Sequence, residues 1–148
     1  VVTLAGFVFA AAMNGQAEQA RAVEAAAQDC VYTRNKVHRL WSSYLSEVIA
    51  HEFSQSLEQA PKQLPAGDPV EAQEARSKQV DAHQRKTQAR LEQLKTWKPP
   101  AAKALGVTDV ERLLTIVAKA PAEVKRPDVT AIEQLKQKLS SCPRPNQK

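Results

Sequence analysis

Glycine is scarce in this sequence, which contains four glycines among its 148 residues. A loop that cradles phosphate needs several closely spaced glycines, and here they are isolated, so the sequence excludes a nucleotide-binding loop of that kind. Apolar and polar residues also never alternate for long enough to indicate a strand. Alanine, glutamine, lysine and glutamate are abundant and favour helix. We therefore expect an all-α fold.

Cysteine is equally scarce, with Cys30 and Cys142 as the two in the chain. Neither lies in a CxxC, CxxH or CxxCH spacing, so we expect neither a zinc site nor an attached haem. His51-Glu52-Phe53-Ser54-Gln55 begins like the HExxH helix of zinc proteases, but Gln55 stands where the second histidine ligand belongs. We expect His51 to be a packed histidine, and we expect no metal and no cofactor.

Signals of nucleophilic catalysis are also absent. The serines near residues 42–54 fall within an expected helix and not at a strand–turn–helix elbow. No Cys–His arrangement is available if both cysteines are bonded to each other. We expect no catalytic residues and no enzymatic activity.

The sequence begins with an uncharged apolar run, residues 1–13. It is shorter than the roughly 20 residues that span a bilayer core. It suits the apolar region of a secretory signal, and Gly15-Gln16-Ala17 has the small-x-small pattern that signal peptidase accepts. We predict a signal peptide over residues 1–17, cleaved before Glu18. A retained apolar anchor and a buried helix are the alternatives.

Export would place both cysteines in an oxidising compartment, where such a pair is usually bonded. We therefore predict a Cys30–Cys142 disulfide and a periplasmic or extracellular location. The alternative is two free thiols in a cytosolic protein. A disulfide that closes a loop of this length stabilises a fold by up to about 4.7 kcal/mol in the chain-entropy model.

Residues 16–60 contain neither proline nor any glycine and predict one long helix. Its apolar or small residues recur at alternating three- and four-residue steps, the spacing of a packed helix pair. These seam residues are Ala20, Val23, Ala27, Cys30, Val37, Trp41, Tyr44 and Val48. Because four of the seven aromatic residues also lie in this helix, we expect it to anchor the core.

Three capping signals predict three further helices. Asp68 with Glu71 begins a polar helix that ends near Thr96 and lies antiparallel to the first helix, mostly in water. Thr108 with Glu111 begins a short helix to about Ala120, and Thr130 with Glu133 begins the last one. Their expected buried faces are Val110, Leu113, Leu114 and Val117, then Ile132, Leu135, Leu139 and Cys142. The predicted fold is an elongated helical hairpin plus two shorter helices, closed by the disulfide.

The domain organisation follows from these elements: a leader over residues 1–17, a single helical domain over 18–142 and a short tail over 143–148. The net charge of +5 comes from residues 98–148, which hold 10 basic and five acidic side chains. This suits an acidic protein partner, or simply a solvated surface. Basic residues are not interleaved with aromatics, so we expect no nucleic-acid binding.

The leading hypothesis is an exported, non-enzymatic helical protein that binds another protein or supports structure in the cell envelope. Candidate contact residues for a partner or ligand are Trp41, Tyr44, Phe53 and Trp97, although core packing is the commoner role for the first three. One alternative is a membrane-tethered coiled-coil subunit, with a retained leader and a homo-oligomer formed through residues 69–97. The other is a carrier of lipid or a small ligand, which needs a cavity among Trp41, Tyr44 and Phe53.

Overall fold

The protein is an all-helical bundle built on one very long helix. The computed structural model describes the backbone of residues 4–145 and the side chains of residues 15–145. The helices are α1 (Leu4–Glu58), α2 (Val70–Lys95), α3 (Val107–Lys119) and α4 (Val129–Ser140), with a short 3₁₀ turn, η1, at Ala102–Ala104. The described residues contain no strand, so the predicted all-α class is confirmed.

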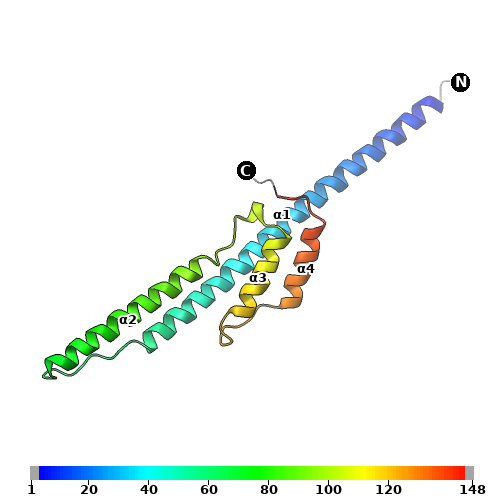
Figure 1. Cartoon of the computed structure of the whole chain (residues 1–148). Helices are drawn as coiled ribbons and strands as arrows, with labels where there is room; N and C mark the ends of the chain where they lie inside the picture. Colours follow the sequence, from blue (N-terminus) through cyan, green and yellow to red (C-terminus); the bar gives the residue numbers. More distant parts are fainter. Residues whose placement is uncertain (1–3, 146–148) are drawn as a thin grey trace.

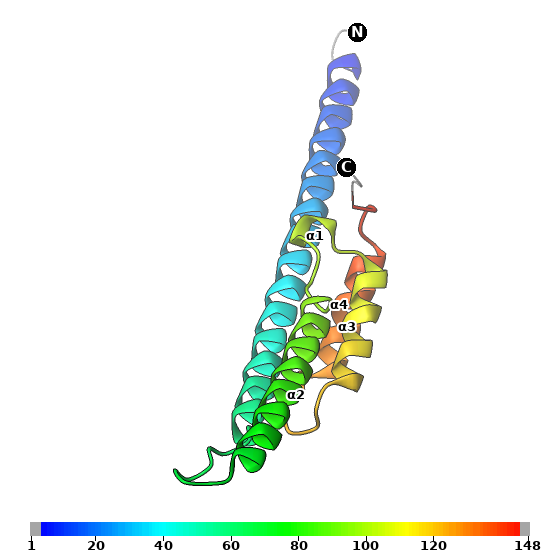
Figure 2. The same cartoon turned by 60° about the vertical axis from the view of Figure 1, so that its left-hand side comes forward.

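α1 passes through three different environments along its length. Its N-terminal part projects beyond the rest of the molecule, its middle carries α3 and α4, and its C-terminal part lies beside α2 (Figures 1 and 2). The predicted elongated hairpin is therefore formed by α1 and α2. α1 begins earlier than expected and continues through the predicted cleavage point after Ala17. Residues 1–3 of the predicted leader and 146–148 of the predicted tail lie outside the described residues.

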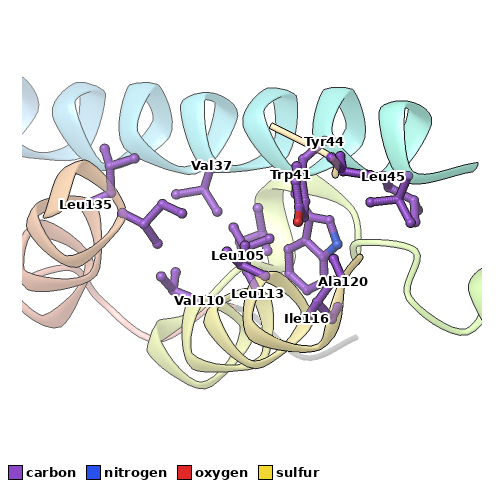
Figure 3. Packing of buried hydrophobic residues seen from close by; sticks show 14 of the residues in the cluster. Val37, Trp41, Tyr44, Leu45, Leu105, Val110, Leu113, Ile116, Ala120 and Leu135 are labelled. Atoms are coloured by element: carbon purple, nitrogen blue, oxygen red, sulfur yellow. The ribbon is translucent and has the colours of Figure 1, made fainter. Parts of the chain in front are cut away.

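The core lies where the middle of α1 meets the C-terminal half of the chain. Trp41, Val48, Leu94, Leu105 and Leu113 are fully buried. Figure 3 shows Trp41 and Val37 pointing from α1 toward side chains of α3 and of the segment before it. The predicted faces of α3 and α4 are confirmed except that Leu114 and Cys142 are partly buried, while Ile116 joins the core.

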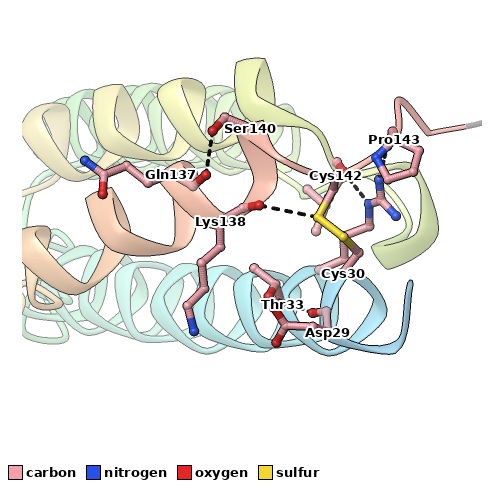
Figure 4. Close-up of a disulfide and its surroundings, with 10 residues drawn as sticks. Asp29, Cys30, Thr33, Gln137, Lys138, Ser140, Cys142 and Pro143 are labelled. Carbon is pink, nitrogen blue, oxygen red and sulfur yellow. Dashed lines mark hydrogen bonds between the residues drawn. A yellow bond between two sulfur atoms is a disulfide. The ribbon is translucent and has the colours of Figure 1, made fainter. Parts of the chain in front are cut away.

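The predicted disulfide is present, with an S–S distance of 2.05 Å between Cys30 and Cys142. It joins the end of α4 to α1, and beside it Arg34 donates hydrogen bonds to the carbonyl oxygens of Leu105 (3.0 Å) and Pro143 (2.6 Å). Figure 4 shows the bond between α1 and the residues that follow α4. Disulfides persist in oxidising compartments, so this bond fits the predicted export.

The predicted caps are wrong, although α2, α3 and α4 each begin within two residues of their expected start. α2 has no side-chain cap; Pro69 precedes it. At α3 the Gly106 N–H donates to the Asp109 carboxylate (2.9 Å), and at α4 the Asp128 carboxylate accepts from the N–H of Thr130 (2.9 Å). The predicted threonine caps are wrong because the residues that cap these two helices are Gly106 and Asp128. Each lies two positions before the expected threonine, and an aspartate side chain accepts the N–H of a helix start as well as a threonine does.

The predicted seam of α1 is wrong at its N-terminal end. All residues from Gly15 to Asp29 are exposed, and Val23 keeps 71% of its surface in water. The spacing of Ala20, Val23 and Ala27 is helical, but no other described element reaches this part of α1 (Figure 1). Among the described residues, none of the helices contains a stretch apolar and long enough to cross a bilayer.

Candidate partner-binding groove

The hairpin formed by the end of α1 and by α2 buries no residue over most of its length. Every residue from Ile49 to Gln93, a range the structure describes completely, is at least partly exposed. Burial begins again at Leu94, where α2 approaches the bundle. Helices normally gain most of their stability by burying an apolar face. Contacts other than a buried apolar core must therefore hold the two helices of this hairpin together.

Polar contacts hold the two helices of the hairpin together. The hydroxyls of Ser56 and Thr87 are 2.8 Å apart, and His83 Nε2 lies 3.0 Å from the Ser56 carbonyl oxygen. One helical turn nearer the bundle, Arg90 donates to Glu52 through both Nη2 (2.7 Å) and Nε (3.0 Å). The Arg90 guanidinium also lies over the Trp97 ring, 5.3 Å from its centre. We call these contacts the polar seam.

The seam does not resemble a nucleophilic site, even though Ser56 and His83 approach each other. His83 Nε2 is closer to the Ser56 carbonyl (3.0 Å) than to the Ser56 hydroxyl (3.4 Å). A ring nitrogen facing a carbonyl oxygen must carry the proton and donate it. The same nitrogen then has no lone pair to accept a proton from the hydroxyl, as a serine nucleophile requires.

Apolar side chains of the hairpin lie to one side of the polar seam. They line an open hollow of about 660 Å³ between α1 and α2, which continues past Pro61 and Val80 into a second hollow of about 420 Å³ under the connecting loop. We call the two together the hairpin groove. Its apolar lining is formed by Ile49, Leu57, Ala60, Pro61, Val80 and Leu91.

The hairpin groove faces away from the bundle. At 100° per residue, Leu57 projects from α1 about half a turn away from Trp41 and Val48, which lie in the core. No segment of the bundle therefore covers the groove. Leu57 is 64% exposed and Leu64, in the loop, is 37% exposed.

The predicted contact residues separate into two kinds. Trp41 (0% exposed) and Tyr44 (4%) are core residues, the commoner role weighed above. Trp41 donates its indole N–H to the Trp97 carbonyl oxygen (2.7 Å) and so ties α1 to the end of α2. Burial raises the pKa of Tyr44; nearby Arg126 lowers it in part and Glu47 adds to the increase.

Phe53 and Trp97 keep accessible surface. Phe53 is 54% exposed and lines a small polar hollow of about 90 Å³ on the face of the hairpin opposite the groove. Trp97 is partly buried against the core. His51 packs partly buried, with Nε2 4.0 Å from the Glu123 carboxylate. Among the described side chains there is no cluster of three metal-ligating groups.

Sequence reasoning missed the hairpin groove, because its apolar residues are spread thinly over two helices. The available signal was the low apolar content of α2, where Val80, Leu91, Leu94 and Trp97 are the main large apolar residues. No protein-family model matches the chain, no curated protein matches its sequence, and no solved structure matches its fold.

Proposed function

We propose that this chain is an exported, non-enzymatic protein that binds a helical segment of a protein in the cell envelope through its hairpin groove. The observation that carries this proposal is the hairpin from Ile49 to Gln93, in which no residue is fully buried and in which Leu57, Val80 and Leu91 line an open groove. An apolar groove between two helices is a common docking site for an amphipathic helix. The disulfide-locked bundle is the rigid base from which the hairpin extends.

The basic C-terminal third provides a second surface in this proposal. Lys119, Lys125 and Lys138 are exposed. An excess of exposed positive charge favours an acidic partner and makes binding salt-dependent, because dissolved ions screen charges on a protein surface. We expect binding that weakens as salt is added but persists in part through the apolar groove.

Photo-crosslinking tests this function. A photoreactive amino acid replaces Gln88, an exposed residue lining the groove, and in a matched control it replaces Gln134, an exposed residue of α4. We expect adducts with defined envelope proteins from position 88 and none from position 134. Equal adducts from both positions, or none from either, would contradict the proposal.

Export is tested by the non-reducing intact mass of the product recovered from cells that make it with its native start. The proposal expects a chain beginning at Glu18 and lacking two hydrogens, because cleavage and disulfide formation both follow export. An uncleaved, fully reduced chain would contradict the proposed periplasmic or extracellular location.

A membrane-tethered subunit is the second candidate. The observation that favours it is the exposed part of α1, Gly15–Asp29, which packs against no other described element and is continuous with the apolar run before it. Isolated helices of this length are marginal in water, so this segment suits a role near a membrane or a partner. Recovery of the uncleaved chain in the membrane fraction would support this candidate. No observation favours a lipid carrier, since Trp41 and Tyr44 pack in the core.

A further inference from the structure

We propose that α2 opens away from α1 about a hinge at Leu94–Trp97, and that the polar seam is the latch that holds it closed. The proposal goes beyond the proposed function, because it concerns the free protein and needs no partner. Three features of α2 carry it: how firmly its C-terminal end is held, how weakly its middle is held, and what lies beside its N-terminal half.

The C-terminal end of α2 is fixed to the bundle. Leu94 is fully buried. Trp41 of α1 donates to the Trp97 carbonyl oxygen (2.7 Å). Arg112 of α3 donates to the Thr96 carbonyl oxygen. Carbonyl groups at a helix end have no partner within the helix, so donors from two other elements hold this end of α2 in place.

The connector between α2 and α3 is fixed to α1 as well. Arg34 donates to the Leu105 carbonyl oxygen (3.0 Å). His38 Nδ1 lies 3.1 Å from the Pro100 carbonyl oxygen. Arg34, His38 and Trp41 are spaced by four and three residues, so they lie on one face of α1. The connector therefore follows this face with a side-chain contact at each successive turn, and it fixes the hinge on α1.

The middle of α2 is held much more weakly. No residue of α2 before Leu94 is buried. The polar seam supplies the hydrogen bonds to α1 here, and its ion pair between Glu52 and Arg90 keeps 18% and 30% of the two side chains exposed. A partly exposed ion pair adds little stability, because water competes for both charges. The latch is therefore weak enough to open while the bundle stays folded.

The N-terminal half of α2 extends past the end of α1. Ser56 contacts His83 close to the point where α1 ends, at Glu58. α2 begins at Val70, about 20 Å beyond His83 at 1.5 Å per residue. Beside this half lies the connecting loop, across the smaller hollow of the groove (Figure 1). No helix therefore holds the end of α2 that lies furthest from the hinge.

Opening would widen the hairpin groove and leave the core intact. Ile49 and Leu91 are partly buried, and with Leu57 they line the larger hollow. These side chains gain exposure when α2 moves away, whereas Trp41 stays packed on the bundle side of the hinge. The hinge therefore controls how much apolar surface the hairpin presents.

Distances between pairs of spin labels, measured by pulsed electron paramagnetic resonance on the oxidised full-length chain, test the hinge. The labels are carried by unnatural amino acids, so that both cysteines stay bonded. One label replaces Gln134 on α4, and the second replaces Lys78 on α2, Ser54 on α1 or Lys95 beside the hinge; all four residues are exposed. We expect two populations of distance for Lys78, and a single narrow distribution for Ser54 and for Lys95.

Two results would overturn the hinge. Narrow distributions for all three pairs would show that α2 stays closed. Equally broad distributions for Lys78 and Ser54 would show that the hairpin moves as a whole and that α2 does not open from α1.

A charge-removing substitution tests the latch. Glu52→Gln removes the ion pair with Arg90, and we expect the ratio of open to closed α2 to rise about two- to fivefold. The matched control is Glu74→Gln, at an exposed residue of α2, which leaves the ratio unchanged. Helical circular dichroism verifies that both variants are folded. The same ratio in E52Q as in the unaltered protein would overturn the latch. Because this experiment contains no partner, its failure leaves the crosslinking from position 88, and with it the proposed function, untouched.

Discussion

α1 belongs to two regions that differ sharply in how they are held together. Between Cys30 and Val48 it packs against α3, α4 and the segment before them, buries Trp41 completely, and is tied to α4 by a disulfide. From Ile49 onward the same helix lies beside α2 without burying one residue. A continuous helix therefore need not be stabilised in the same way along its length. α1 contributes to the core between Cys30 and Val48, and from Ile49 onward it leaves its face exposed.

The contrast also locates function and stability in different places. Binding surfaces are drawn from the less stable part of a protein, where side chains are free to find another partner. Here the bundle buries most of its large apolar residues, whereas the hairpin, although mostly polar, leaves Phe53, Leu57 and Val70 more than half exposed.

Two aromatic residues of α1 give the largest expected difference. Trp41→Ala removes a fully buried indole and its hydrogen bond to the Trp97 carbonyl, and should lower the free energy of unfolding by about 3–5 kcal/mol. Phe53→Ala, twelve residues further along the helix, should change it by no more than about 0.5 kcal/mol, because Phe53 is 54% exposed. Urea unfolding of both variants measures the difference, and equal losses would break the comparison.

The disulfide should stabilise the bundle and leave the hairpin unaffected. Replacing Cys30 and Cys142 together by serine should cost about 2–4 kcal/mol, because the unfolded chain loses a long closed loop. Thermal unfolding measures the loss of stability. The rate of proteolysis in the loop of residues 60–69 shows whether the hairpin is affected as well. Faster cleavage of that loop in the double variant under folded conditions would show that the two regions are coupled after all.

The polar seam should contribute a smaller amount, confined to the hairpin. Arg90→Met removes the ion pair with Glu52 and the contact over the Trp97 ring, and should cost about 1 kcal/mol because the pair is partly exposed to water. Arg85→Met, an exposed position of the same helix, is the matched control and should cost almost nothing. Hydrogen exchange of α2 amides measures both. Faster hydrogen exchange in α3 and α4 of the R90M variant would show that the effect is not confined to the hairpin.

The smallest effect concerns the hydroxyl of Tyr44, a buried group without a hydrogen-bond partner among the described residues. Tyr44→Phe should leave the stability at neutral pH unchanged or slightly higher, because an unpaired polar group is removed from the core. Loss of more than about 1 kcal/mol would reveal a partner for this hydroxyl.

The same substitution should also change the response to alkaline pH. Burial raises the pKa of Tyr44 above 10.0 in the folded protein. Below the ordinary pKa both states hold the proton, so the group has no effect there; above it the unfolded chain loses the proton first, and stability falls as pH rises. Urea unfolding between about pH 8 and pH 11 should therefore show a smaller alkaline loss in Y44F than in the unaltered protein.

Much of the fold could be predicted from the sequence, because its signals are local. Prolines at 61, 99, 100, 121 and 127 separate the helices, and three- and four-residue spacing identifies the buried faces around Trp41, Leu113 and Leu135. The pairing of Cys30 with Cys142 followed from the number of cysteines. Local spacing gives the face of a helix, but it does not give the length over which a partner covers that face.

The extent of the core and the groove could not be predicted for that reason. Val23 continues the spacing of the buried face, yet α3 and α4 are too short to reach it. Ser56, His83 and Thr87 look like ordinary polar surface residues in sequence, because their hydrogen bonds join positions 27 and 31 residues apart. The proposed function therefore depends on contacts between distant residues, which the helical pattern does not contain.

Hydrogen exchange of the purified, oxidised protein tests the division into two regions most directly. We expect the slowest exchange in the Cys30–Val48 part of α1 and in α3 and α4, and much faster exchange from Ile49 to Gln93. Equal protection along the whole of α1 and α2 would show that the hairpin is stable without an occupant. That result would contradict the claim that its apolar face is left for another chain.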